Sequence, residues 1–142
     1  NLSCTMYLSQ LIIPIMKAHG GGNIVNVASI SGITADASGT LYGASKAGVI
    51  NLTRYIATQV GKKNIRCNAV APGATVTPAH LANKAGEQPG GAEMLKYSGH
   101  FVYFPGPECD PMDQAYACLY LASKMGRAVR GQVIQVCNGA FL

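Results

Sequence analysis

Apolar side chains recur at helical intervals in three segments of the chain, and few charged residues interrupt them. This periodicity predicts helices over residues 2–18, 41–62 and 112–123. Pro111 stands near the start of the third segment, where a helix tolerates proline. Because the first segment carries so few charges, we expect its helix to be mostly buried.

Three short runs of β-branched and other apolar residues follow these helices, at residues 24–28, 65–71 and 132–136. Turn residues bound them, and Pro72-Gly73 ends the second run. Strands that alternate with helices predict a parallel sheet joined by right-handed crossovers. With three strands, the pattern predicts an α/β chain that corresponds to half of a doubly wound fold.

Residues 77–107 change in character, because glycine, proline and polar residues replace the regular apolar pattern. Short helices are expected over 79–85 and 92–97, within a long excursion from the sheet. Four of the ten aromatic residues fall here: Tyr97, Phe101, Tyr103 and Phe104. These rings either form an apolar lid over a substrate or pack the excursion onto the body or onto a neighbouring subunit.

Length and composition limit the classes of protein to which the chain can belong. The chain has 142 residues, of which 49% are hydrophobic and 12% charged, so it suits one domain or part of one and is not intrinsically disordered. No apolar run approaches the roughly 20 residues that a membrane-spanning helix needs. The opening segment shows no signal peptide, and we expect the true start of the gene product to be missing.

Charge and cysteine content limit the classes of binding partner and the cellular compartment that fit this chain. The net charge is +5, but the basic residues are scattered along the chain and only Lys62-Lys63 are adjacent, which argues against nucleic-acid binding. Together with Arg66, this pair indicates a solvated helix end. The five cysteines have no disulfide or zinc spacing and indicate buried free thiols in a reducing cytoplasm. His80 and His100 have no carboxylate or thiol at ligand spacing, so no metal site is assigned.

Tyr42 and Lys46 are the strongest candidates for chemistry. They are four residues apart at the start of a predicted helix, so their side chains share one face. A phenol in water ionises near pH ~10, and a nearby ammonium group favours the phenolate, which permits proton exchange nearer neutral pH. Ser29 follows the first strand at its carboxyl end, where α/β sheets place their ligands. Taken singly, Tyr42 and Lys46 also fit a packed tyrosine and a solvated lysine, and Ser29 fits a turn or cap.

Three stretches together resemble the motifs of the classical short-chain dehydrogenases/reductases, and thirteen positions separate Ser29 from Tyr42, as in that family. Asn1-Leu2, with Pro14 and Met16, is similar to the family's helix that bears a fourth catalytic residue. The three stretches are Asn-Ile-Val-Asn-Val-Ala-Ser at 23–29, Tyr-Gly-Ala-Ser-Lys at 42–46, and Asn-Ala-Val-Ala-Pro-Gly-Ala-Thr-Val-Thr at 68–77.

The resemblance implies four catalytic roles. Tyr42 is the expected general acid in ketone reduction and the base in alcohol oxidation. Lys46 is expected to hold the nicotinamide ribose and tune Tyr42. Ser29 is expected to hold the substrate oxygen, and Asn1 to support a water-linked proton relay.

The resemblance also implies a cofactor, NAD or NADP, and a Rossmann-type fold. Besides Tyr42 and Lys46, the residues expected to contact this cofactor are Pro72, Gly73 and the backbone of Thr75 at the nicotinamide, and Thr77 near the phosphates. The implied reaction interconverts a secondary alcohol and a ketone. An apolar lid over the site favours a hydroxysteroid or similar apolar alcohol as the substrate. A 3-oxoacyl thioester reductase is the alternative enzyme, and a homo-oligomer, dimer or tetramer, is expected.

Three departures from the family pattern shape the remaining expectations. Ala28 replaces the usual second serine, and Cys137-Asn138-Gly139 stands where the family has Asp-Gly-Gly. No Gly-x-x-x-Gly-x-Gly phosphate loop is present. We therefore expect residues 1–142 to be the C-terminal part of a Rossmann-like domain, without the half that binds the dinucleotide phosphates. The alternative that involves no catalysis is a fragment that acts only as an association surface.

Overall fold

The computed structural model describes residues 1–35, 38–87, 89–91, 93, 96 and 108–140. The main elements are α1 (Leu2–Ala18), β1 (Gly22–Val27), α2 (Thr40–Val60), β2 (Ile65–Pro72), α3 (Pro78–Lys84), α5 (Pro111–Ala122) and β3 (Val133–Val136). Short 3₁₀ turns are η1 (Ile30–Gly32), η2 (Gly61–Lys63) and η3 (Lys124–Gly126). The helix expected over 92–97 falls largely outside the described residues, as do the four aromatic residues of the excursion and His100.

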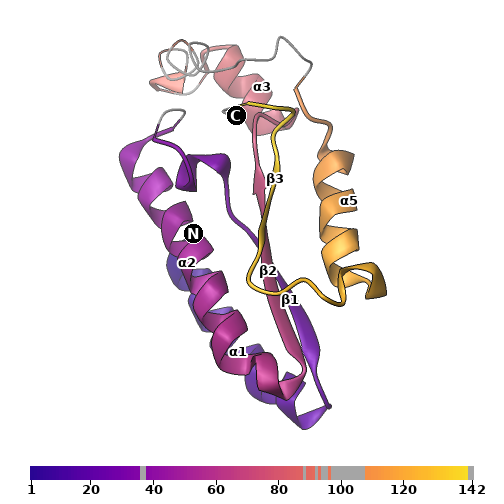
Figure 1. The fold of residues 1–142 in the computed structure, drawn as a ribbon. Coiled ribbons are helices and arrows are strands. Elements are labelled where there is room, and N and C mark those ends of the chain that lie inside the picture. Colours follow the sequence, from indigo (N-terminus) through magenta and orange to yellow (C-terminus); the bar gives the residue numbers. More distant parts are fainter. Residues whose placement is uncertain (36–37, 88, 92, 94–95, 97–107, 141–142) are drawn as a thin grey trace.

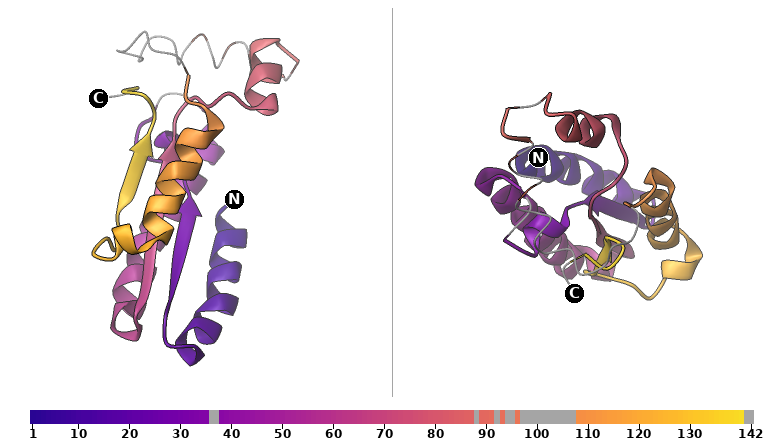
Figure 2. Two further views of the ribbon diagram at one scale, coloured as in Figure 1. Left: turned by 90° about the vertical axis from the view of Figure 1, so that its right-hand side faces the viewer. Right: turned by 90° about the horizontal axis from the view of Figure 1, so that it is seen from above.

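The three strands form a parallel sheet in the order β1-β2-β3. Helices α1 and α2 cover one face and α5 covers the other (Figures 1 and 2). All three strands run in the same direction, so their carboxyl ends meet at one edge of the sheet. The predicted α/β architecture with three parallel strands is confirmed.

The core is centred on β2, which has a strand on each side and helices over both faces. Its residues Ile65, Cys67, Ala69, Val70 and Ala71 are fully buried. This two-sided burial explains why the second half of β2, residues 69–72, is a continuous apolar run. The core therefore fixes the position of the strand that leads into Pro72-Gly73.

Helix α1 is far more exposed than its sequence predicts. Ser9 is its buried residue, whereas Leu8 is 61% and Leu11 69% exposed. Ile13 and Met16 do pack on the sheet. Apolar side chains surround most of α1, and the sheet together with α2 contacts only one side of it. The prediction of a mostly buried helix was therefore wrong for this structure.

The cysteines are all unpaired, and Cys67, Cys109 and Cys137 are buried as expected. Burial raises the pKa of Cys67 to about 12, so this thiol stays protonated and unreactive. Cys4 departs from the expectation, because it is exposed on α1.

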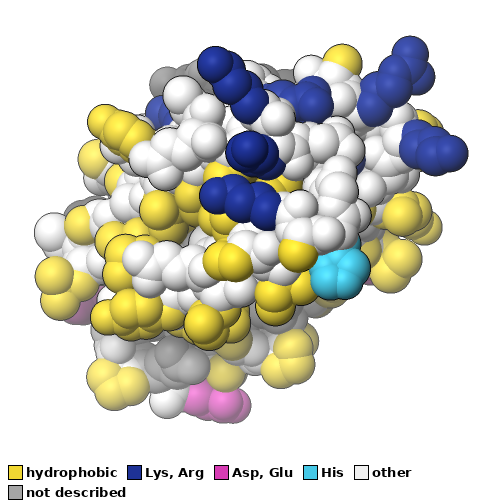
Figure 3. Space-filling model, turned by 90° about the horizontal axis from the view of Figure 1, so that it is seen from below, with side chains coloured by type: hydrophobic (Ala, Val, Ile, Leu, Met, Phe, Trp, Pro, Cys, Tyr) yellow, Lys and Arg dark blue, Asp and Glu magenta, His cyan; other side chains and the backbone are white. Residues whose placement is uncertain are grey.

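Basic side chains that are scattered in the sequence gather where the strands begin (Figure 3). Lys17 precedes β1, Lys62 and Lys63 precede β2, and Arg127 and Arg130 precede β3. All five are exposed. Parallel strands begin at one end of a sheet, so the topology places these charges opposite the carboxyl edge. Among the described residues, none of the helices has the length and hydrophobicity needed to cross a membrane.

Arg66 is not part of a solvated helix end, which corrects the sequence prediction. It lies on β2, and its guanidinium group donates to the carbonyl oxygens of Leu121 (2.7 Å), Gly126 (2.8 Å) and Ser123 (3.2 Å). These carbonyls lie at and beyond the end of α5, where helices leave acceptors without partners. Arg66 therefore joins the central strand to the end of the opposite helix.

Substituting Arg66→Met should lower the free energy of unfolding by about 2 kcal/mol, because three partly buried carbonyls lose a charged donor. Chemical denaturation of the purified chain measures the change. Lys63→Met, an exposed position in η2, is the matched control and should change stability by less than about 0.5 kcal/mol. Equal effects of the two substitutions would contradict this role of Arg66.

Candidate active site

Ser29 lies just beyond the carboxyl end of β1, where it begins η1. Its Oγ accepts a hydrogen bond from the backbone N–H of Ser31 at 3.2 Å, and the residue is 7% exposed. The alternative of a capping serine is therefore part of its role. The hydroxyl proton is a separate donor, which the cap does not use.

Tyr42 and Lys46 lie in the first two turns of α2, on one face. Lys46 Nζ lies 5.6 Å from the centroid of the Tyr42 ring, within range of a cation–π contact. The same ammonium donates to the carbonyl oxygen of Val27, the last residue of β1, at 2.8 Å. Burial lowers the pKa of Lys46. Lys46 is thus tethered to the strand end beside Tyr42 and is not a freely solvated lysine.

Two glycines bring η1 directly against α2. A Cβ atom on Gly32 would lie 2.6 Å from the backbone nitrogen of Ala47 and from the carbonyl carbon of Lys46. A Cβ atom on Gly43 would lie 2.9 Å from the Ser31 carbonyl oxygen. Contact this close is possible only without side chains. Neither glycine was predicted to be a site residue, although small residues at 43, 44 and 47 of the helix are a signal for close packing.

Asn1 precedes α1, and its backbone carbonyl accepts a hydrogen bond from Thr5 Oγ1 at 3.0 Å. Its side chain makes no capping hydrogen bond to the helix. The next residue, Leu2, contacts α2 at Gly48, where an added Cβ would lie 2.7 Å from Leu2 Cδ2. Gly48 is two residues beyond Lys46, so the start of α1 lies beside the part of α2 that carries Lys46.

Pro72 and Gly73 end β2 at the same edge of the sheet. The Gly73 N–H donates to the Val136 carbonyl oxygen at 2.9 Å. A Cβ atom on Gly73 would lie 2.6 Å from Cys137 Cβ. The glycine therefore allows the chain after β3 to pack against the turn, a packing role that was not predicted from the sequence.

Thr75 and Thr77 use their hydroxyl groups within the protein. Thr75 Oγ1 donates to the Gly73 carbonyl oxygen at 3.1 Å and accepts from Gln114 Nε2 at 3.2 Å. Thr77 begins α3, and its Oγ1 accepts from the backbone N–H of His80 at 3.2 Å. Their hydrogen bonds hold the turn after β2 in place.

His80 has an acidic partner that local spacing in the sequence does not show. Its Nε2 lies 2.6 Å from Glu108 Oε1, and Lys84 Nζ lies 2.7 Å from the same oxygen. Hydrogen bonds from Lys84 and His80 lower the pKa of Glu108. A lowered pKa means that the interaction stabilises the fold at neutral pH and is lost as the solution becomes acidic. The described residues contain no group of three metal-binding side chains.

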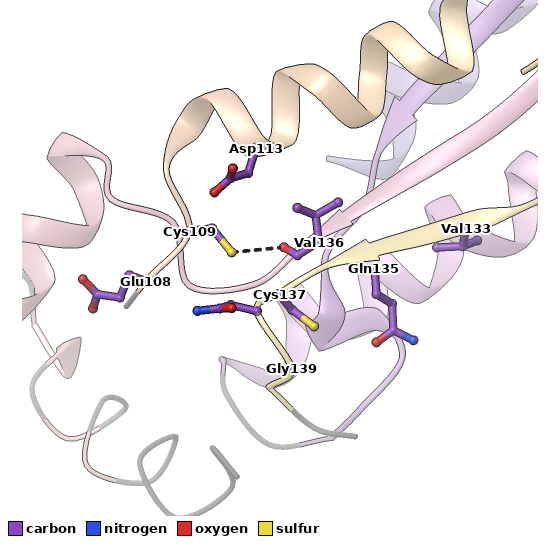
Figure 4. A pocket seen from close by; sticks show the side chains of 9 residues that line it. Glu108, Cys109, Asp113, Val133, Gln135, Val136, Cys137 and Gly139 are labelled. Carbon is purple, nitrogen blue, oxygen red and sulfur yellow. Dashed lines mark hydrogen bonds between the residues drawn. The ribbon is translucent and has the colours of Figure 1, made fainter. Parts of the chain in front are cut away.

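A cavity of about 830 Å³ lies beside the carboxyl end of β3 (Figure 4). Glu108, Cys109, Asp113 and Gln135 are among its lining residues. A second cavity, of about 580 Å³, lies between η1 and the start of α2. Ser29, Tyr42 and Lys46 are not among the residues that line these two cavities in the described part of the chain.

The site residues are thus grouped by two strand ends and one helix. Ser29, Tyr42 and Lys46 are joined through β1, η1 and α2, and Asn1 directly precedes the neighbouring helix α1. Pro72, Gly73, Thr75 and Thr77 follow the adjacent strand end. The arrangement offers a hydroxyl donor, a phenol and a nearby positive charge at the edge where doubly wound sheets bind ligands.

Comparisons with known proteins show what the chain is similar to. A family model described as enoyl-(acyl carrier protein) reductase matches residues 1–140. The chain is 61% identical over 139 residues to a 7α-hydroxysteroid dehydrogenase of Bacteroides fragilis, covering 98% of this chain and 51% of the relative. It is 38% identical over 144 aligned positions to a 3-oxoacyl-[acyl-carrier-protein] reductase of Thermotoga maritima, covering 100% of this chain and 54% of the relative.

A solved structure of a 7α-hydroxysteroid dehydrogenase, complexed with NADH and 7-oxo glycochenodeoxycholic acid, superposes with a TM-score of 0.79 at 34% identity. The match covers 99% of this chain and 52% of that one. The chain therefore spans about half the length of the relatives it matches. With the family model, the sequence identities and the fold in agreement, this chain belongs to the short-chain dehydrogenase/reductase family.

Proposed function

We propose that the protein carrying this chain oxidises a hydroxysteroid, or reduces the corresponding ketosteroid, with NAD or NADP. The observation that carries the proposal is the Lys46 ammonium, held 2.8 Å from the end of β1 and 5.6 Å from the Tyr42 ring. The 61% identity to a 7α-hydroxysteroid dehydrogenase supports the substrate class.

The donors at this edge fit a nicotinamide nucleotide. A lysine ammonium has three N–H donors, and Val27 uses one of those on Lys46, so two remain for ribose hydroxyls. Pro72, Gly73 and the Thr75 backbone would lie along the nicotinamide, and Thr77 nearer the phosphates. When bound, the cofactor donates or accepts the hydride.

The chain's own residues hold the substrate and move its proton. The Ser29 hydroxyl donates to the substrate oxygen and orients it. Tyr42 delivers a proton to that oxygen in the reductive direction and removes it in the oxidative direction. The Lys46 ammonium lies beside the Tyr42 ring, and Asn1 supports a water-linked path for the proton.

An assay of the full-length gene product tests this function. With NAD⁺ and NADP⁺ in parallel, we expect oxidation of a 7α-hydroxysteroid at least about 100-fold faster, by kcat/KM, than of its 7β epimer, because the epimer moves the reacting hydroxyl away from Ser29 and Tyr42. Faster reduction of a 3-oxoacyl thioester would favour the alternative suggested by the Thermotoga maritima relative.

Association is the second candidate, favoured by the exposed apolar side of α1. Leu8, Leu11 and Ile15 are each more than half exposed there, which favours contact with a second copy in a homo-oligomer. Micromolar binding of NAD or NADP by the 142-residue chain alone would contradict a purely associative role.

The five unpaired cysteines support the expected cytoplasmic location.

A further inference from the structure

His80, Glu108 and Lys84 form a cluster that joins two parts of the chain far apart in sequence. His80 and Lys84 lie on α3, shortly after β2, whereas Glu108 lies shortly before α5. The two side chains contact the same oxygen, Glu108 Oε1. His80 Nε2 lies 2.6 Å from it and Lys84 Nζ lies 2.7 Å from it. Contacts this short to a carboxylate are charge-assisted and stronger than neutral hydrogen bonds.

The cluster is partly shielded from solvent. The side chains of His80 and Glu108 are 14% and 28% exposed, whereas Lys84 is half exposed. The lowered pKa of Glu108 agrees with a carboxylate held in its charged form. Figure 4 shows the Glu108 carboxylate at the end of the cavity away from Val133. In that view the Glu108 carboxylate points away from Cys109 and Val136.

Backbone contacts connect Glu108 to the turn after β2. The next residue, Cys109, forms a parallel bridge with Thr75. Its N–H donates to the Ala74 carbonyl oxygen at 2.9 Å, and its carbonyl accepts from the Val76 N–H at 3.0 Å. The backbone on both sides of Thr75 is thereby attached to the residue that follows Glu108.

The other end of the cluster is connected to Thr77. Its hydroxyl accepts from the His80 N–H, and its carbonyl accepts from the Leu81 N–H at 2.9 Å. His80 is therefore held both by its backbone, at Thr77, and by its ring, at Glu108. Release of the ring would leave α3 attached to the turn mainly through its first residues.

We propose that Glu108 is a positioning residue, which fixes α3 against the 108–109 segment and so holds Thr75 and Thr77 in place for the nicotinamide cofactor. The proposal rests on the proposed function, because it assumes that these threonines lie along the cofactor. Glu108 itself does not touch the reacting atoms. It acts through His80 and Lys84 on one side and through the Cys109 bridge on the other.

The test compares Glu108→Gln with Glu87→Gln in the full-length gene product. Glu87 is an exposed carboxylate in the same excursion, so its substitution removes an equal charge without touching the cluster. For Glu108→Gln we expect a three- to tenfold rise, roughly, in the KM for NAD or NADP with kcat within about twofold of wild type. Glu87→Gln should leave both constants unchanged.

Hydrogen exchange provides a readout that does not depend on catalysis. In Glu108→Gln, the Leu81 and Ala85 amides, which donate within and at the end of α3, should exchange about tenfold faster, whereas amides of β2 should not change. Because β2 is buried, unchanged protection there also shows that the variant is folded. His80→Gln combined with Glu108→Gln should add little to either single substitution.

The outcomes separate the two proposals. If the wild type binds neither NAD nor NADP, the proposed function fails. If the wild type binds cofactor but Glu108→Gln leaves the cofactor KM unchanged, the positioning role is overturned, whether or not α3 exchanges faster. Unchanged exchange in α3 would overturn the cluster's part in holding it.

Discussion

Tyr42→Phe is expected to lower kcat for hydroxysteroid oxidation by about 10²–10⁴-fold, the range typical of a lost general acid or base. The substitution removes one hydroxyl and keeps the ring, so the contact between the ring and the Lys46 ammonium remains. Tyr42 is 40% exposed, and its hydroxyl is not part of the core, so the free energy of unfolding should change by less than about 0.5 kcal/mol.

Tyr55→Phe is the matched control for this prediction. Tyr55 lies on the same helix, is 61% exposed and is distant from Ser29 in the fold, being thirteen residues beyond Tyr42. It should retain wild-type kcat. The steady-state rate with saturating steroid and cofactor measures both variants, and substantial turnover by Tyr42→Phe would refute the proton-transfer role.

Gly32→Ala is the second substitution with a large expected effect. The added methyl group would meet the backbone of Lys46 and Ala47 at 2.6 Å, and backbone atoms cannot rotate out of the way as a side chain can. Either η1 or the start of α2 must therefore move. Overpacking of this kind costs about 1–3 kcal/mol of stability.

Gly32→Ala should also impair catalysis. Because η1 begins at Ser29 and α2 carries Tyr42 and Lys46, a shift between them separates the substrate-holding hydroxyl from the proton-transferring phenol. A displacement near 1 Å is enough to lower kcat/KM by about 10²-fold.

Gly61→Ala isolates the steric cause. Gly61 follows α2 in a helical conformation, with φ −54°, and no atom lies within 4 Å of an added Cβ. This substitution should retain activity and leave stability equal or slightly raised. If Gly32→Ala were as active as Gly61→Ala, the close approach of η1 and α2 would not govern the site.

Much of the fold could be predicted from local patterns. The helical periodicity of residues 41–62 corresponds to α2 and η2, and the apolar runs near Ile24, Arg66 and Val133 correspond to the three parallel strands. Periodicity reports which side of an element is apolar, so it located the elements well. It does not report how much of that side a neighbour covers, which is why the burial of α1 was predicted wrongly.

The site was predictable in its parts and less so in its connections. Ser29, Tyr42 and Lys46 stand out because their spacing matches a family motif. Arg66, Glu108 and Gly32 do not, because each acts through a partner that the local pattern does not indicate. Arg66 reaches Leu121, 55 residues away, and His80 reaches Glu108, 28 residues away.

By itself, the sequence determined the α/β class, the order of the elements, the family and the residue types available for proton transfer. These properties depend on residues close together in the chain. The tertiary structure decided that Lys46 is tethered to Val27, that scattered lysines and arginines share one end of the sheet, and that His80 and Lys84 of α3 contact Glu108. Such pairings arise because a parallel sheet brings all its strand ends together, whatever their distance along the chain.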